Sequence, residues 1–508
     1  MRLRMLLGFV LALGTVGLAR GPASADKASD TLNVVFRDGV PNIDPYQNSQ
    51  RTGIIVGHHV WDTLVHRDPA TFEIRPMIAT EWTIVDDRTI DFKLRPGVKF
   101  HDGNPLTSDD VVYTLNYAAN PDSKVATPSN YNWIDRAEKK GELEVRLHMK
   151  RPTPAALQYL SFVGYIHPKA YREKLGLEAF PKAPIGSGPY RVTKVEPGKQ
   201  IDLERFEGYW EQSPKGRPAI KRIVIRFVPD AATEMTELLS GRADWIWNIN
   251  PDQFENVNRM PTLRAERKES MRIGFLSMDA AGRSGAGNPL TNVKVRQAIF
   301  HAIDRQALAD RLVTGGSRVP EGPCYPTQFG CDAEAAVKYD YNPEKAKMLL
   351  AEAGFPNGFD TELVTFVLPT WASAMQNYLQ AVGIRARITQ IQVAAYIQRS
   401  WRGENPLGLG SWGSYSINDV SAIMPNYFTF GNDDYVRNDD LRRLVEEGGS
   451  TNDPEKRKKA YSAAIRMVME QAYWLPLHTY VTTYGFSRQL DFTPWADELP
   501  RFYWAKWK

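Results

Sequence analysis

The chain has 508 residues, with 63 basic and 59 acidic side chains and a formal net charge of +4. Arg2, Arg4 and Arg20 lie in an N-terminal stretch without acidic residues, so the rest carries 60 basic and 59 acidic residues, a net charge of about +1. A near-neutral surface argues against nucleic-acid binding, which needs a basic face. One hydrophobic core serves at most ~250–300 residues, so we expect two or three domains.

Residues 1–25 have the order of a cleavable signal peptide. Basic residues come first, an apolar run extends from Met5 to Leu18, and a small-residue triplet follows at 23–25. The run is shorter than the ~20 residues of a membrane-spanning helix and contains glycines, which makes a membrane anchor the weaker alternative. We therefore expect export to the periplasm and a soluble mature chain from about Asp26.

Alternating apolar residues predict half-buried strands at residues 32–36 and 223–227. Between them, residues 91–94 form a strand-like segment and Asp102-Gly103 supplies a tight turn. Thr107 and Asp110 then have the spacing of a capping box, which predicts the start of a helix. Strand, turn and capped helix are thus expected in close succession.

The second half of the chain carries clear helix and strand patterns. An apolar stripe predicts a helix over residues 293–303. Asn342 as the cap, a proline in the first turn and Gly354 as the stop predict another. Residues 362–391 read as strand, helix and strand, which predicts a parallel pair.

Cys324 and Cys331 are the two cysteines of the chain. In an exported protein they should form one disulfide, and closing so short a loop is worth about 2.5 kcal/mol in the chain-entropy model. Metal binding by the pair is the weaker alternative, because the spacing is not CxxC and no histidine is near.

A long motif at residues 92–111, FKLRPGVKFHDGNPLTSDDV, resembles the signature of the extracellular solute-binding protein family 5. Further stretches agree in the same order, at 76–82 (PMIATEW), 186–190 (GSGPY), 209–210 (YW) and 346–354 (AKMLLAEAG). The resemblance covers nearly the whole chain after residue 25. That family includes binding proteins for dipeptides, oligopeptides, nickel complexes, opines and glutathione.

The resemblance implies an α/β fold of the periplasmic-binding-protein type, a type II, cluster C-like clamp of two lobes with an extra subdomain inserted in the first. Lobe I would comprise residues 26–58, 186–271 and 483–508, the inserted subdomain 59–185, and lobe II 272–482. A solute would bind between the lobes, which close around it by hinge motion and deliver it to an ABC permease in the inner membrane. Such receptors usually act as monomers without a cofactor.

By the same resemblance, a loop of lobe II should contact the solute. A tryptophan packs over the ligand there, and nearby polar groups orient it. The candidates are Trp412, Ser414, Tyr415, Asn418 and Asp419, with the alternative that Trp412 is a core anchor and the others form an ordinary turn. Peptide binders of the family place an aspartate three residues after this tryptophan to pair with the peptide amine, but position 415 is Tyr. Asp419 could replace that aspartate, or the ligand lacks a free amine, as an opine-like or blocked solute would.

The other half of the site is expected from residues 46–52 and from the inserted subdomain. Asn48 and Thr52 would face the cleft, and Arg51 would clamp a carboxylate or else be an ordinary surface charge. Trp133 would add a stacking wall, with a buried structural role as the alternative. The terminal cluster Arg501, Lys506 and Lys508 reads as a solvated tail.

Other classes of function fit less well. The adjacent His58 and His59 point to different faces, and together with His101 and His478 they read as packed or exposed histidines, so no metal site is expected. A secreted glycosidase is conceivable from 13 tryptophans and many acids, but no GxSxG or HExxH motif occurs. No Walker-type loop predicts a nucleotide cofactor. A sensory partner with the same fold remains an alternative to import.

Overall fold

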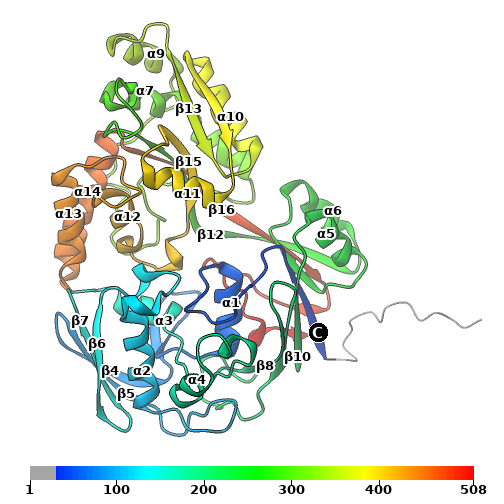
Figure 1. Ribbon diagram of the computed structural model, residues 1–508. Helices are drawn as coiled ribbons and strands as arrows, with labels where there is room; N and C mark the ends of the chain where they lie inside the picture. Colours follow the sequence, from blue (N-terminus) through cyan, green and yellow to red (C-terminus); the bar gives the residue numbers. More distant parts are fainter. Residues whose placement is uncertain (1–29) are drawn as a thin grey trace, which may run out of the picture.

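The computed structural model describes residues 30–508, so the expected signal peptide lies outside the described residues. Its main sheet has ten strands in the order β14-β13-β15-β12-β16-β11-β1-β10-β9-β8. Figure 1 shows that α7, α9, α10, α11, α13, α14, β13 and β15 form an upper lobe, while α1 to α4, β4 to β8, β10 and the C-terminus form the lower half, with α5 and α6 at its side. One sheet therefore runs through both halves of the molecule.

Two long antiparallel strands connect the halves, β12 (Leu263–Met278) and β16 (Trp474–Ser487). Their register shifts between Ser270 and Ile273, where a β-bulge interrupts the ladder. The lobe boundaries expected at 271/272 and 482/483 fall inside these two strands. The connection between the lobes is thus a hydrogen-bonded ribbon.

Lobe I is built on strands that were expected from their alternation. Strand β1 (Thr31–Phe36) pairs in parallel with β10 (Arg222–Phe227) and β11 (Trp245–Trp247). The outer strands are β9 (Gln200–Arg205) and β8 (Tyr190–Glu196). The prediction of half-burial is confirmed for β10 but is wrong for β1, which is buried along almost all of its length. A central strand flanked by two parallel neighbours is covered on both faces, so its outward residues are apolar as well.

The inserted subdomain has its own sheet, in the order β4 (Ala79–Asp86), β5 (Thr89–Leu94), β7 (Glu144–Met149) and β6 (Ile134–Gly141). Helix α2 (Ser108–Ala119) follows, and its capping box of Thr107 and Asp110 is confirmed. His101, in the turn before α2, accepts from the Gly186 N–H at 3.1 Å and lies 3.0 Å from the Gly188 carbonyl. The signature turn therefore ties the subdomain to lobe I.

Lobe II contains the predicted parallel unit, β13 (Phe359–Thr365), α10 (Pro369–Ala381) and β14 (Ile384–Gln390), with β15 (Leu407–Trp412) beside β13. Helices α7 (Val293–Ala302) and α9 (Pro343–Glu352) are confirmed, and Asn342 caps α9 through its side chain. Helices α13 (Asp439–Gly449) and α14 (Pro454–Glu470) lie on the side of lobe II that faces the subdomain sheet (Figure 1).

The remaining elements connect or cover these sheets. They are α1 (Arg51–Val60), β2 (Val65–Arg67), β3 (Ile74–Pro76), α3 (Ala156–Val163), α4 (Lys169–Leu175), α5 (Ala231–Leu239), α6 (Phe254–Arg259), α8 (Arg305–Leu308), α11 (Val393–Arg402), α12 (Met424–Phe428), β17 (Leu490–Asp491) and β18 (Lys506–Trp507). Among residues 30–508, no helix is both long and apolar enough to cross a bilayer.

The C-terminal segment returns to lobe I. Phe502 lies edge-on to Trp245, with ring centroids 5.0 Å apart, in the lobe I core. The expectation of a solvated tail is wrong for Arg501, whose side chain is 6% exposed because it pairs with the buried Asp497. Lys506 stays on the surface, 3.5 Å from Asp491. The end of the chain is therefore part of the folded core.

The glycines at 186–190 allow this segment to pass against the end of α1. A Cβ on Gly186 would stand 2.1 Å from the Val60 carbonyl oxygen and 2.8 Å from a ring carbon of Trp61. Both neighbours are rigid, so G186A should lower the free energy of unfolding by about 2 kcal/mol or more. In the control G141A, the nearest atom to the new Cβ lies at 3.6 Å, and we expect little change. Urea unfolding of the three proteins measures the difference, and equal midpoints would contradict this account of the motif.

Candidate functional site

The two halves of the molecule touch along a seam, so the structure is in a closed arrangement. Arg51, the first residue of α1, donates from Nη1 to Ser416 Oγ of lobe II at 3.0 Å. Arg67 of β2 donates to the Ser416 carbonyl. At the outer edge, Asn452 Nδ2 donates to Asp87 at 3.1 Å and links lobe II to the subdomain.

Six charged side chains meet at the inner part of this seam, and we call them the interlobe ion cluster. Glu498 Oε2 lies 3.3 Å from Arg272 Nη2 and 3.6 Å from Arg51 Nη2. Asp497 Oδ2 lies 2.7 Å from an Arg501 nitrogen and 3.2 Å from Arg67 Nη2. The members of the cluster are Arg51, Arg67, Arg272, Arg501, Asp497 and Glu498.

A β-bulge places Arg272 in the cluster. The register of β12 against β16 jumps from Ser270 to Ile273, so Arg272 lies in the extra segment of the bulge. The preceding Met271 donates its N–H to the Ala496 carbonyl at 2.8 Å, which holds the C-terminal segment beside the hinge. Bulges re-aim side chains, and this one directs a cation from the connecting ribbon toward Glu498.

The two carboxyl groups of the cluster are held in the charged form. Burial by itself would raise the pKa of Asp497, but Arg501 and Arg67 outweigh it and lower the pKa to about 2. Burial likewise opposes ionisation of Glu498, and Arg272 with Arg51 holds its pKa below the ordinary value. Both carboxylates are therefore ionised at neutral pH.

Positive charge is in excess within the cluster. Four guanidinium groups face two carboxylates, and the Glu498 contacts of 3.3 and 3.6 Å are longer than the ~2.7–2.9 Å of a tight charge-assisted hydrogen bond. The side chains of Arg272 and Arg51 retain 29% and 16% exposure, whereas Arg67 and Asp497 are almost completely buried. Arg272 and Arg51 thus keep donor capacity for a further anionic group.

The end of β15 and the loop after it bring Trp412, Ser414 and Tyr415 to the seam. The indole N–H of Trp412 donates to the Ala422 carbonyl at 3.0 Å, and its ring lies edge-on to Tyr415 with centroids 5.0 Å apart. Residues 414, 415 and 416 all have positive φ, at 48°, 47° and 57°. Three consecutive non-glycine residues in this left-handed region are strained, and such strain persists only where surrounding contacts impose it.

Asn418 and Asp419 lie behind this loop and are engaged within lobe II. Asp419 is 5% exposed and accepts from a single Arg457 nitrogen at 2.7 and 2.9 Å. It also accepts from the Ser421 N–H. The Asn418 carbonyl accepts from the Phe329 N–H at 3.1 Å. The carboxylate of Asp419 therefore already has a cation partner within lobe II.

The disulfide supports the same loop from outside. Cys324 and Cys331 are bonded, as expected. Between them, Gln328 Nε2 donates to the Ile417 carbonyl at 2.8 Å. The short cross-linked segment thus fixes the backbone that follows Ser416, a role that spacing alone did not reveal.

The other site candidates from the first part of the chain, Asn48, Thr52 and Trp133, are buried side chains. Asn48 is 7% exposed, and its amide donates to the Asn42 carbonyl while its oxygen accepts from the Gln50 N–H, so it shapes the loop before α1. Thr52 is 1% exposed, and its hydroxyl has no hydrogen-bond partner among the described residues. Trp133 is 2% exposed, with its indole N–H on the Asn130 carbonyl at 2.8 Å.

The histidines are packed into the structure. Burial, partly offset by the Ile55 carbonyl, lowers the pKa of His59 to about 3, and its Nε2 accepts from the Phe502 N–H at 3.1 Å. Burial also lowers the pKa of His101 and of His478 to about 4. Within residues 30–508, no group of three or more His, Cys, Asp or Glu side chains is arranged to hold a metal ion.

Sequence reasoning identified Arg51 but missed Arg67, Arg272, Ser416, Asp497 and Glu498 as members of this seam. They come from segments hundreds of residues apart, and each stands in an ordinary local context. The adjacent acids 497 and 498, next to the basic residue at 501, were the one local signal, because paired acids in an apolar segment invite buried ion pairs.

Removing the Asp497 charge should leave the buried Arg67 and Arg501 without their carboxylate partner. We expect D497N to lower the free energy of unfolding at pH 7 by about 3 kcal/mol. The native pKa of about 2 lies below the unfolded value of ~3.9, so this contribution is fully present above about pH 4 and is lost as the pH falls toward 2. The gap between wild type and D497N should therefore shrink over that interval in urea unfolding.

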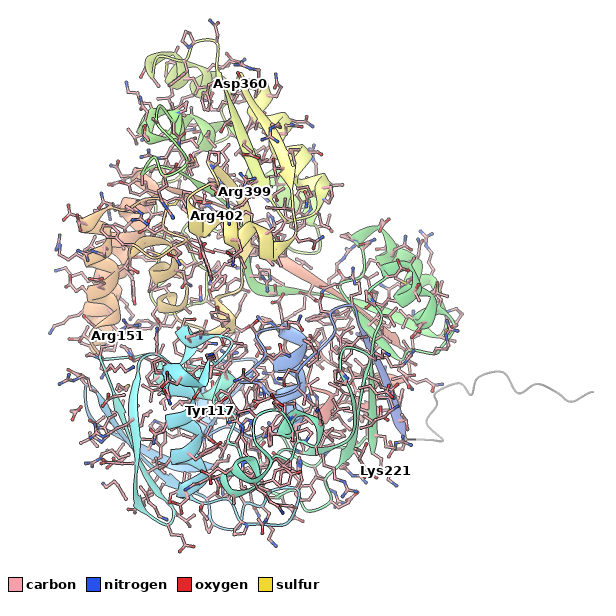
Figure 2. The ribbon with its side chains drawn as sticks, in the orientation of Figure 1. Tyr117, Arg151, Lys221, Asp360, Arg399 and Arg402 are labelled. Carbon is pink, nitrogen blue, oxygen red and sulfur yellow. A yellow bond between two sulfur atoms is a disulfide. The ribbon has the colours of Figure 1, made fainter. Side chains whose placement is uncertain are left out.

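The control for D497N is D360N, at an exposed carboxylate on lobe II that pairs with Arg385 at 2.8 Å (Figure 2). Exposed ion pairs contribute little, so we expect a change below about 1 kcal/mol. A D497N protein as stable as D360N, or a gap that does not depend on pH, would contradict the assignment.

Comparisons with known proteins agree with this architecture. The relatives include the heme-binding protein A of Haemophilus influenzae, 26% identical over 462 residues that cover 82% of this chain and 81% of the relative. The glutathione-binding protein GsiB of Escherichia coli (strain K12) is 26% identical over 473 residues, 90% of each chain.

Solved structures show the same fold. HbpA2 from Haemophilus parasuis matches with a TM-score of 0.79 and 24% identity, over 94% of this chain and 100% of that one. A dipeptide binding protein from Pseudoalteromonas sp. SM9913 in complex with Met-Leu matches with a TM-score of 0.80 and 22% identity, over the same shares. The expected two-lobed clamp is confirmed.

The model of the bacterial extracellular solute-binding proteins, family 5, matches residues 73–434, most of the chain. The chain therefore belongs to this family of bacterial extracellular solute-binding proteins.

Proposed function

We propose that this protein captures a small peptide or peptide-like solute that carries at least one carboxylate, with glutathione as the first candidate, and delivers it to the permease of an ABC importer. The leader at residues 1–25 would direct it to the periplasm, where it acts as a monomer. The observation that carries the proposal is the excess of guanidinium groups over carboxylates in the interlobe ion cluster.

A solute carboxylate would complete the cluster. Uncompensated buried charge is costly, whereas a guanidinium bound to a carboxylate gains strong, directional hydrogen bonds. Arg272 and Arg51 combine partial exposure with spare donors, so they are the proposed contacts, and Trp412 would cover the solute from lobe II. A relative that shares 26% identity over 90% of both chains is a glutathione-binding protein, which supports a solute of this chemistry.

The absence of an aspartate at position 415 supports recognition through the anionic end of the solute. Asp419, the acidic side chain that we expected to replace it, is paired with Arg457 at 2.7 Å. We therefore propose that a free amine on the solute contributes little to affinity. An opine, which resembles a peptide without an ordinary free amine, is the alternative ligand that the same argument allows.

Closure would follow from binding at the seam. Arg51 contributes from lobe I, Arg272 from the hinge and Ser416 from lobe II, so an anion at this position is held fully only when the lobes meet. A ligand shifts an equilibrium by its differential affinity for the two states, and contacts that exist only in the closed state supply that difference.

The variant R272Q, which removes the Arg272 charge, should bind glutathione at least about 30-fold more weakly than wild type, equivalent to about 2 kcal/mol. We expect R272K to recover part of the affinity, because it keeps the charge but not the fork of donors. Calorimetric titration with glutathione and with its diethyl ester, in which both carboxyl groups are blocked, measures both effects, and the ester should bind wild type more weakly.

The matched control is R264Q, on the same strand but on the surface of lobe I, where Arg264 pairs with Glu266. It should bind glutathione like the wild type. Equal affinities for R272Q and R264Q would refute the role of the ion cluster, and an ester that binds as tightly as glutathione would refute recognition of a carboxylate.

A further inference from the structure

A cavity lies outside the ion cluster, between the inserted subdomain and lobe II. Its volume is about 350 Å³, within the range of small-molecule sites. Figure 2 shows Arg151, one of its lining residues, where the subdomain meets the helices α13 and α14 of lobe II. We call it the outer chamber, and its principal lining residues are Ser129, Trp133, Tyr159, Ser421, Pro425 and Thr429.

The lining of the outer chamber is apolar and uncharged over most of its area. Trp133 and Tyr159 form an aromatic wall, with ring centroids 6.2 Å apart, and prolines extend the apolar surface. Hydroxyl groups supply the neutral polar atoms. Arg151 and Glu446 are the two charged lining residues, both exposed and of opposite sign, so they leave no net charge.

Both lobes are needed to form the outer chamber. Residues 129–159 belong to the inserted subdomain and residues 421–450 to lobe II, so the chamber exists only when the molecule is closed. The hydrogen bond from Asn452 to Asp87 lies near the same edge and joins the same two parts. A group that binds here would therefore favour closure.

Tyr415 connects the chamber to the site already described. Its ring lies 5.0 Å from that of Trp412, on the side of the ion cluster. Burial raises the pKa of Tyr415 and an interaction of its hydroxyl with Ser129, a lining residue, opposes the rise. Tyr415 therefore lies between Trp412 and Ser129, a lining residue of the chamber.

We propose that the outer chamber binds an uncharged, ring-bearing group, as a second ligand site that adjoins the anion site across Tyr415. Aromatic and proline surfaces favour a flat apolar group, and the surrounding hydroxyls can hydrogen-bond to an amide or ether on it. For a natural solute, this inference rests on the proposed function: a peptide-like solute that bears a ring would place its carboxylate at the ion cluster and the ring in the chamber, whereas glutathione, which has no ring, would occupy the ion cluster alone. The chamber itself can be tested without that assumption.

The test uses N-benzylacetamide, an uncharged ring with one amide, titrated alone and followed by ligand-observed NMR. Wild type should bind it in the low millimolar range, as expected for a fragment, whereas N-methylacetamide, which lacks the ring, should not bind. S421W fills the chamber and should weaken binding at least tenfold. S373W makes the same change at an exposed position of α10, far from the chamber, and should leave binding unchanged.

Two results would overturn the proposal, namely no binding of N-benzylacetamide to wild type, and equal binding to S421W and S373W when both show wild-type thermal unfolding. Benzoate that binds more tightly than N-benzylacetamide, with the same loss in S421W, would refute an uncharged ligand class. Glutathione titrated into the same proteins tests the ion cluster separately. If glutathione fails to bind while the fragment results hold, the proposed function fails and the outer chamber stands.

Discussion

The antiparallel pair of β12 and β16 is the constraint on which the rest of the structure depends. These strands carry one hydrogen-bonded sheet from lobe I into lobe II. The ladder is interrupted by register shifts between Ser270 and Ile273 and between Gly274 and Phe275. The first of these directs Arg272 to the seam.

Charge pairing in the interlobe ion cluster favours contact between the two lobes. Four arginines and two acids meet where the lobes touch, and the acids are kept ionised by their partners although they are buried. Asp497 is satisfied by Arg67 and Arg501, which makes it part of the framework. Glu498 pairs at longer distances with Arg51 and Arg272, which are more exposed than Arg67 and Arg501. We propose that an anionic solute completes this part of the cluster.

The backbone of residues 414–416, after Trp412, is strained and is held in place by neighbouring contacts. Three left-handed residues at 414–416 bring Ser416 to Arg51 and Tyr415 to the edge of the outer chamber. The Arg457–Asp419 pair and the segment closed by the Cys324–Cys331 disulfide hold the backbone behind it. A strained backbone of this kind persists only because neighbouring contacts compensate for its strain. The same contacts hold the side chains of the loop in place.

Local patterns in the sequence determined much of the scaffold. The capping box at Thr107, the helix after Asn342, the parallel unit at 362–391 and the disulfide were predictable because each depends on residues close in the chain, and a long motif indicated the family. The burial of β1 on both faces and of Arg501 escaped prediction, since both depend on what packs against them. Only the tertiary structure decided the candidate site itself. Arg51, Arg272 and Glu498 lie more than two hundred residues apart in the chain, and the shared sheet brings their segments together. Their charge pairing and burial therefore could not be read from any local pattern.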